Sequence, residues 1–151
     1  MNTRDQEKSM NLTFDDSKVA DEFAPFWQAA RRSRLSFPHC RECGRFHWYP
    51  MPLCPHCQSA EIEWRDVPAK GELYSYTTVH HPYQDELAKH VPYVVGLVEF
   101  KDAPGIRLVT NVDVAPEALR VGMPVSAVFS EPGSKDVSVR FRPRRDGEDT
   151  G

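Results

Sequence analysis

The cysteines are the residues of this chain whose type and spacing indicate chemistry most directly. They fall into two Cys-x-x-Cys pairs separated by ten residues: Cys40 and Cys43, then Cys54 and Cys57. Each pair bends the chain so that two sulfur atoms converge, and two such pairs supply the thiolates of a closed tetrahedral zinc site. Because cysteine fills all four ligand positions, no position is left for a water molecule. We therefore expect one zinc ion with a structural role.

Other uses of the four cysteines fit the sequence less well. Iron fits the same cage of thiolates, so the choice between zinc and iron stays open. Disulfides would call for an export signal, and residues 1–16 are polar, without the apolar segment of such a signal. A thioredoxin-like redox site would use a single pair at a strand-to-helix junction. The neighbouring His39, His47 and His56 are predicted to be surface or supporting residues.

Length and charge limit the kinds of protein that this chain can be. Its 151 residues, 40% of them apolar, are enough for one modest core and a metal-stapled module. The net charge of −3 provides no overall attraction to nucleic acid. No run of eighteen apolar residues occurs, so we expect no membrane span. Metal-binding cysteines without an export signal predict a cytoplasmic protein.

An amphipathic helical segment is predicted before the cysteines, over residues 17–36, after a polar tail at 1–16 that we expect to be disordered. Pro25 either kinks one helix or opens a second. The aromatic face of this segment packs on the chain's own ribbon or barrel, or it docks into a partner's groove. Because a small ribbon offers little surface to cover aromatic rings, we predict partner binding by Phe23, Phe26 and Trp27.

Beyond a predicted zinc ribbon at residues 37–66, the pattern is that of an all-β domain over residues 67–143. A helical turn at 116–119 separates the third predicted strand from the fourth, which is the outline of an OB-fold barrel. The predicted fold is thus mainly β with an N-terminal helix, a four-cysteine zinc ribbon and a five-stranded OB-fold barrel. Residues 144–151 form a polar tail. The strands are predicted at 72–79, 93–100, 106–113, 125–129 and 137–141.

Several short motifs, in this order, resemble one known family over residues 21–143. They are the Phe26-Trp27 pair, CxxCG and CPxC, Gly-x-Leu-Tyr-Ser-Tyr-Thr, Pro-Tyr-Val-Val, Val-Gly-Met-Pro-Val and Phe-Arg-Pro. The family combines an N-terminal rubredoxin-like zinc ribbon with a C-terminal OB-fold and was long catalogued as a domain of unknown function. The four cysteines match the family's metal ligands one by one, although Gln58 stands where a glycine would follow Cys57.

The resemblance implies an accessory subunit for enzymes of acyl-CoA metabolism, in lipid or aromatic acid pathways. Such chains form hetero-oligomers with thiolase-like proteins, which supply the catalytic residues and cleave or form a carbon–carbon bond of a CoA thioester. A non-catalytic role agrees with the residues, because each cysteine is committed to metal and no thiolate nucleophile remains. Two alternatives stay open: a partner of a hot-dog-fold enoyl-CoA hydratase, and a single-stranded nucleic-acid-binding OB-fold.

Two groups of residues are predicted to lie near the acyl-CoA of the assembled complex. The loop between the first two barrel strands carries His81 and Tyr83, at a position where OB-folds commonly present a binding loop. The last strand carries Arg140 and Arg142 on one side, where the phosphates of CoA can bind. A solvated strand face, with nearby acids balancing the arginines, is the alternative for the second group.

Overall fold

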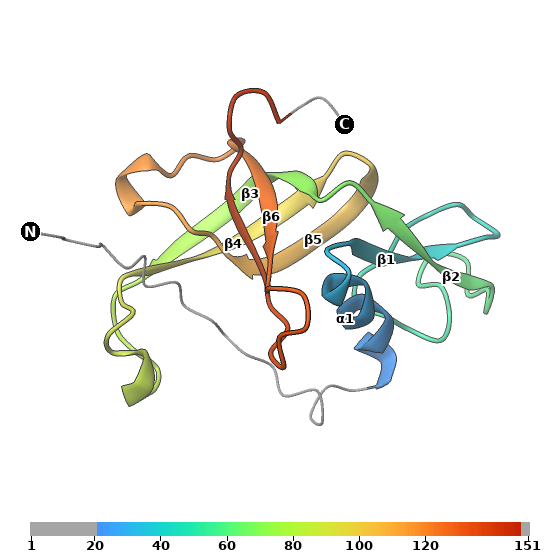
Figure 1. Ribbon diagram of the computed structural model, residues 1–151. Coiled ribbons are helices and arrows are strands. Elements are labelled where there is room, and N and C mark those ends of the chain that lie inside the picture. Colours follow the sequence, from blue (N-terminus) through green and yellow to red (C-terminus); the bar gives the residue numbers. More distant parts are fainter. Residues whose placement is uncertain (1–20, 149–151) are drawn as a thin grey trace, which may run out of the picture.

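The computed structural model describes residues 21–148 as a mostly β protein with one short α-helix (Figure 1). A two-stranded sheet and a five-stranded sheet make up its β structure. This architecture confirms the predicted fold class. No helix within these residues is long and apolar enough to cross a bilayer.

The N-terminal helix is shorter than the sequence predicts. A 3-10 turn, η2 (Asp21–Phe23), leads into α1 (Ala24–Arg31), and Pro25 lies in the first turn of α1. Of the two roles considered for Pro25, it therefore has that of a helix opener. Ser33 takes a left-handed conformation with φ of 56°, which ends the helical path. Residues 17–20 of the predicted segment lie outside the described residues.

The ribbon is built on a hairpin of strands that the sequence does not reveal. Strand β1 (Leu35–Cys40) pairs antiparallel with β2 (Ile62–Val67), so that Leu35 lies opposite Val67 and Cys40 opposite Ile62. The ten residues between the cysteine pairs contain no strand and join the ladder only through an isolated bridge between His39 and Phe46. Both cysteine turns are thus carried between the two strands of this hairpin.

The five-stranded sheet closes into the OB-fold barrel. Its strands follow the order β5-β4-β3-β6-β7 and are antiparallel. A parallel bridge between Val112 and Phe141 joins the end of β5 to β7, and the Asp113 N–H donates to the Phe141 carbonyl at 2.7 Å. A 3-10 turn, η4 (Pro116–Ala118), precedes β6. The barrel strands are β3 (Lys70–Val79), β4 (Tyr93–Phe100), β5 (Ala103–Asn111), β6 (Pro124–Phe129) and β7 (Val139–Pro143).

Most predicted barrel strands agree closely with the observed ones, and β5, which begins three residues earlier than predicted, and β7 differ most. The residues Ile106, Leu108 and Thr110 of β5 are all buried, as their alternation predicts. Strand β7 begins two residues later than predicted. Before it, the Ser130 N–H donates to the Ser138 carbonyl at 3.2 Å, so pairing between the two arms of the hairpin continues just outside β6 and β7.

One hydrophobic core joins the helix and ribbon to the barrel. The ring of Phe37, on β1, is completely buried and lies 6.1 Å from the ring of Phe26, 5.4 Å from Trp48 and 5.1 Å from Phe100. Leu35 and Phe37 belong to the same buried cluster as the inward-facing residues of the barrel. The ribbon is therefore held against the barrel by shared packing, and the zinc site extends from that base.

Candidate functional site

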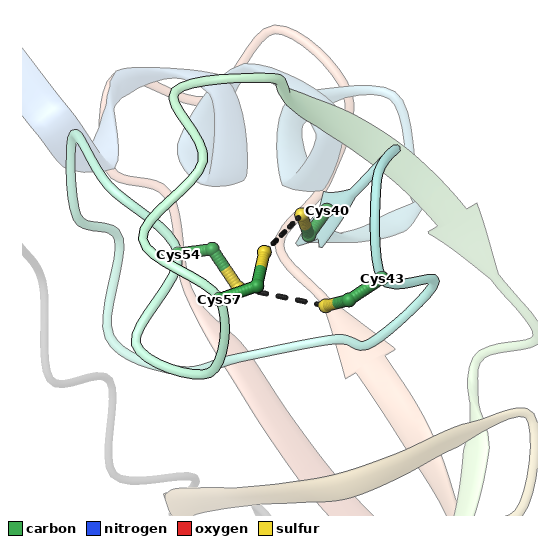
Figure 2. A group of neighbouring side chains, drawn as sticks. All are labelled: Cys40, Cys43, Cys54 and Cys57. Atoms are coloured by element: carbon green, nitrogen blue, oxygen red, sulfur yellow. Dashed lines mark hydrogen bonds between the residues drawn. The ribbon is translucent and has the colours of Figure 1, made fainter.

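The four cysteine side chains converge on one point of the ribbon (Figure 2). Their Sγ atoms all lie within 4.8 Å of one another. The Sγ atoms of Cys40 and Cys57 are 3.6 Å apart, and those of Cys43 and Cys54 are 3.7 Å apart. A zinc ion with Zn–S bonds of about 2.3 Å needs sulfur atoms about 3.8 Å apart at the corners of a tetrahedron. The four thiols therefore fit a tetrahedral zinc ion.

The two cysteine turns have the same backbone design. The Gly44 N–H donates to the Cys40 carbonyl at 2.9 Å, and the Gln58 N–H donates to the Cys54 carbonyl at 2.8 Å. Both donors follow the second cysteine of their pair and take left-handed conformations, with φ of 71° and 62°. Gln58 thus takes a left-handed conformation that glycine would take without strain. The steric strain of its Cβ atom in this conformation costs on the order of 1 kcal/mol.

Without a metal, the thiols of the second pair titrate very differently. Desolvation is the strongest influence on Cys54 and would raise its pKa, but the N–H groups of Cys57 and His56 and the adjacent sulfurs together lower that pKa to about 6. The Ser59 N–H is the strongest influence on Cys57 and lowers its pKa, yet desolvation and the other sulfurs outweigh it and raise the pKa to about 12. Zinc binding must displace protons, so zinc affinity falls as the pH falls.

His39, next to the first ligand, braces the first cysteine turn. Its ring is buried, with Nδ1 3.2 Å from Glu63 Oε1 and Nε2 3.1 Å from the Gly44 carbonyl oxygen. The ring also packs edge-on against Phe46 at 4.7 Å. His39 therefore links the turn after Cys43 to strand β2. The sequence predicts a surface or a supporting role for this histidine; the buried ring has the supporting one, and its partner on β2 becomes visible only in the fold.

Replacing His39 with phenylalanine is expected to weaken zinc binding about 10- to 100-fold, the usual effect of losing a supporting hydrogen bond around a metal. Phenylalanine keeps the packing against Phe46 and removes both hydrogen bonds. Competition with a chromogenic zinc chelator measures the change. His56→Phe is the matched control, because His56 is exposed. Equal zinc affinity in the two variants would contradict the bracing role.

Phe26 packs on its own chain, which is the alternative to partner binding that the sequence left open. Its side chain is only 3% exposed and lies within the chain's own core, against Phe37, Trp27 and Trp48. Phe23 is half-buried and contacts Trp48, with ring centroids 5.7 Å apart, and Trp27 is also half-buried. Phe26 thus stabilises the ribbon–barrel junction. Partner contacts by Phe23 and Trp27 stay predictions.

The residues predicted to lie near acyl-CoA are found on two parts of the barrel. His81 and Tyr83 belong to the loop that leaves the barrel between β3 and β4 and carries the turn η3 (Asp85–Leu87) (Figure 1). Tyr83 is 86% exposed, the most exposed large apolar side chain of the described residues. Arg140 and Arg142 flank the buried Phe141 on β7, as the alternation predicts.

Both arginines of β7 are paired with acids of the chain itself. Arg140 Nη1 lies 2.7 Å from Asp113 Oδ2, and Arg142 bonds the carboxylate of Glu148 through both terminal nitrogens. The Arg142 hydrogen bond is the main reason that the pKa of Glu148 falls to about 2, with help from the Arg145 N–H. This pairing agrees with the alternative of a balanced strand face. Phosphate binding by these arginines stays a prediction.

An exposed aromatic ring and a basic side chain of the barrel, of the kinds that could stack a base and meet a phosphate in the nucleic-acid alternative, contact each other. The Arg107 guanidinium carbon lies 3.8 Å from the ring centroid of Tyr74, a cation–π contact on the outer face of β3 and β5. Arg107 therefore lies over the ring face of Tyr74 that a nucleic-acid base would need for stacking.

Sequence reasoning overlooked an exposed apolar segment between the two cysteine turns. Tyr49, Met51 and Leu53 alternate there with Pro50 and Pro52, and all three large side chains are exposed. The alternation of prolines with apolar residues is the signal that could have identified this segment as a rigid surface.

Comparison with known proteins finds a matching domain family for each half of the chain. Residues 27–63 match the rubredoxin-like zinc ribbon domain of ChsH2, and residues 64–130 match the C-terminal OB-fold domain of ChsH2. A DUF35 domain-containing scaffold protein from Pyrococcus furiosus is 31% identical, over 78% of this chain and 90% of the relative. A DUF35 domain-containing scaffold protein from Methanocaldococcus jannaschii is 35% identical, over 60% and 63%.

Two further matches are to a longer protein and to a chain of a solved aldolase structure. It is 39% identical to a probable enoyl-CoA hydratase alpha subunit from Thermomonospora curvata, over 78% of this chain but only 36% of the relative, so it spans about a third of that protein. Among solved structures, a chain of the Ltp2-ChsH2(DUF35) aldolase matches with a TM-score of 0.72 and 35% identity, over 83% of this chain and 97% of the other. The zinc ribbon, the OB-fold barrel and these similarities show that the chain belongs to the DUF35 family of ChsH2-type proteins.

Proposed function

We propose that this chain is a non-catalytic scaffold subunit that pairs with an enzyme acting on CoA thioesters. The observation that carries the proposal is the similarity to the Ltp2-ChsH2(DUF35) aldolase, in which 97% of the matched chain aligns at 35% identity. The relatives named as scaffold proteins support the same role. The reaction of the assembly is cleavage or formation of a carbon–carbon bond, and the partner is a thiolase-like subunit.

The distribution of nucleophiles supports a division of labour between this chain and its partner. Thiolase-type chemistry needs a cysteine thiolate, a base and an oxyanion hole. The sequence contains four cysteines, and all of them converge in the proposed zinc site. The partner therefore supplies the nucleophile, while zinc fixes the ribbon that this chain contributes. The assembly works in the cytoplasm.

The exposed loop between β3 and β4 is the part of the barrel best suited to border the partner's acyl site. Tyr83 presents an almost fully exposed aromatic ring at this loop, and His81 is exposed beside it. An aromatic side chain that the chain itself does not cover is a typical anchor at interfaces. Arg140 and Arg142 are assigned a weaker role near the CoA phosphates, since an acid pairs with each of them.

A second candidate partner is an enoyl-CoA hydratase of the hot-dog fold. The similarity to the probable enoyl-CoA hydratase alpha subunit favours it, because that protein contains a region like this chain within a longer sequence. The two candidates differ in the reaction that the complex catalyses, and both give this chain a supporting role.

Reconstitution with purified subunits tests the proposal. The chain is combined in turn with a thiolase-like and a hydratase-like subunit from its own host, and turnover of CoA thioesters is followed. We expect turnover only when the chain and one catalytic subunit are both present, and we expect deletion of residues 80–90 to reduce it. Turnover by this chain alone, or full turnover by a catalytic subunit without it, would contradict the proposal.

A further inference from the structure

An exposed apolar surface lies on the ribbon, outside the zinc site. The segment between the two cysteine turns reads Tyr-Pro-Met-Pro-Leu from Tyr49 to Leu53. Tyr49 is 56% exposed, Met51 43% and Leu53 50%. Three of the eight large hydrophobic side chains that are exposed within residues 21–148 therefore fall in five consecutive positions. Clusters of this kind on a small protein usually mark an interaction site.

A groove of about 390 Å³ opens beside this segment. Its volume falls within the range of about 300–1,000 Å³ that is typical of binding sites. Prolines fix the backbone of two of its walls, so little conformational entropy is lost when something binds there. The apolar residues that line it come from four parts of the chain: Pro25, Pro38, Pro50, Met51, Pro52, Ile62 and Trp64.

The charge of the groove indicates what it binds. Asp21 and Glu22 also line it, both side chains are exposed, and no lysine or arginine of residues 21–148 lines it. An apolar groove with an acidic rim complements an apolar segment that carries a basic residue. A second copy of this chain fits poorly, because a twofold contact would bring the same acidic rim from both copies to one interface.

We propose that this ribbon groove, defined by the apolar residues above with Asp21 and Glu22, receives an apolar segment of the catalytic subunit. A lysine or arginine of that segment pairs with the two acids at the rim. This inference rests on the proposed function, since it names the surface by which the scaffold subunit grips its enzyme.

The construction of the groove makes it dependent on the zinc site. Pro50 and Pro52 lie between the two cysteine turns, whereas Trp64 lies on β2, opposite the buried Pro38 of β1. Loss of the metal therefore frees the wall that contains Pro50 and Pro52 and leaves the wall that contains Trp64 in place. The structural zinc thus holds the surface that the partner recognises.

Affinity measurements with substituted chains test the inference. The probe is the catalytic subunit that co-purifies with the chain from its host, and its Kd for each variant is measured by titration calorimetry. Met51→Glu places a charge in the groove, and the double substitution Asp21→Lys with Glu22→Lys reverses the rim. We expect each change to weaken binding at least 10-fold. Because an attraction becomes a repulsion, the salt dependence should also reverse: added salt should weaken association of the wild type and strengthen association of the rim variant.

Matched controls place the same chemical changes elsewhere on the surface. Val121→Glu adds a charge at an exposed apolar residue of the barrel, and Glu131→Lys with Asp136→Lys reverses two exposed acids beyond β6. These variants should bind within about threefold of the wild type. Zinc content and thermal unfolding are measured for every variant, so that a loss of binding is read only from folded, metal-loaded protein.

A photocrosslinking amino acid at position 51 or at position 121 gives an independent answer in the assembled complex. We expect position 51 to crosslink to a catalytic-subunit peptide containing lysine or arginine, and position 121 to give none. Crosslinks from position 51 to a second copy, or within the chain itself, would overturn the inference. Unchanged affinity of the groove variants for a subunit that binds the wild type would overturn it too, while leaving the proposed function intact. Failure of the wild type to bind any catalytic subunit would instead remove the proposed function.

Discussion

Removal of zinc is expected to disorder the ribbon from residue 41 to residue 61 and to leave the barrel folded. Zinc binding contributes about 10–16 kcal/mol in isolated zinc-finger peptides, and that free energy is folding free energy. Between Cys40 and Ile62 the structure has turns and one isolated bridge but no strand. Apart from Phe46 and Trp48, which pack against the shared core together with β1 and β2, the metal is therefore the main support of this segment.

Amide hydrogen exchange with and without a strong chelator measures this effect. Cys54→Ser should give the same pattern without a chelator, because Cys54 is buried and one of the four ligands is lost. His56→Ser is the control, since it changes an exposed neighbour and leaves the four sulfurs in place. If the amides of residues 41–61 stayed protected from exchange after complete zinc removal, the two cysteine turns would be shown to fold without metal.

Replacing Phe37 with alanine is expected to lower the free energy of unfolding by about 3–5 kcal/mol, the usual cost of deleting a buried aromatic side chain. The upper part of this range applies, because Phe37 is completely buried and contacts three other aromatic rings. Urea denaturation of the zinc-loaded protein measures the change. Tyr83→Ala is the comparison, since a largely exposed side chain should alter stability by no more than about 0.5 kcal/mol.

The same substitution tests whether the ribbon and barrel form one cooperative unit. Phe37 on β1 and Phe100 on β4 lie 5.1 Å apart, across the junction of the two parts. A double-mutant cycle of the two alanine substitutions should therefore give a coupling free energy of about 0.5–3 kcal/mol. Strictly additive effects, or a separate unfolding transition for the barrel, would contradict a shared core.

The barrel could be predicted from the sequence because its strands follow a local rule. Residues of β5 alternate between buried and exposed, which the apolar pattern of Ile106, Leu108 and Thr110 reveals directly. Strand β1 follows no such rule. All six of its residues are buried, so its two faces do not differ, and its partner β2 lies more than twenty residues away along the chain. Pairing of that kind depends on the whole fold.

The candidate sites also differ in how far the sequence predicts them, depending on whether their residues are close together in the chain. The cysteine spacing alone predicts the metal ligands, because each turn is a local structure. The aromatic face of α1 indicates that something covers Phe26 but not what, and in the structure the covering residues belong to the same chain. The ribbon groove combines residues 21–25, Pro38, residues 50–52 and residues 62–64, which only the folded ribbon brings together.

Native mass spectrometry of the complex purified gently from the host through a C-terminal tag on this chain tests the central proposal most directly. The scaffold role predicts a species containing this chain, a catalytic subunit of CoA-thioester metabolism and one zinc ion for each copy of the chain. Sequencing that subunit by tandem mass spectrometry distinguishes a thiolase-like partner from a hydratase. A zinc-bound chain that appears alone, or one that carries an oligonucleotide, would contradict the proposed function.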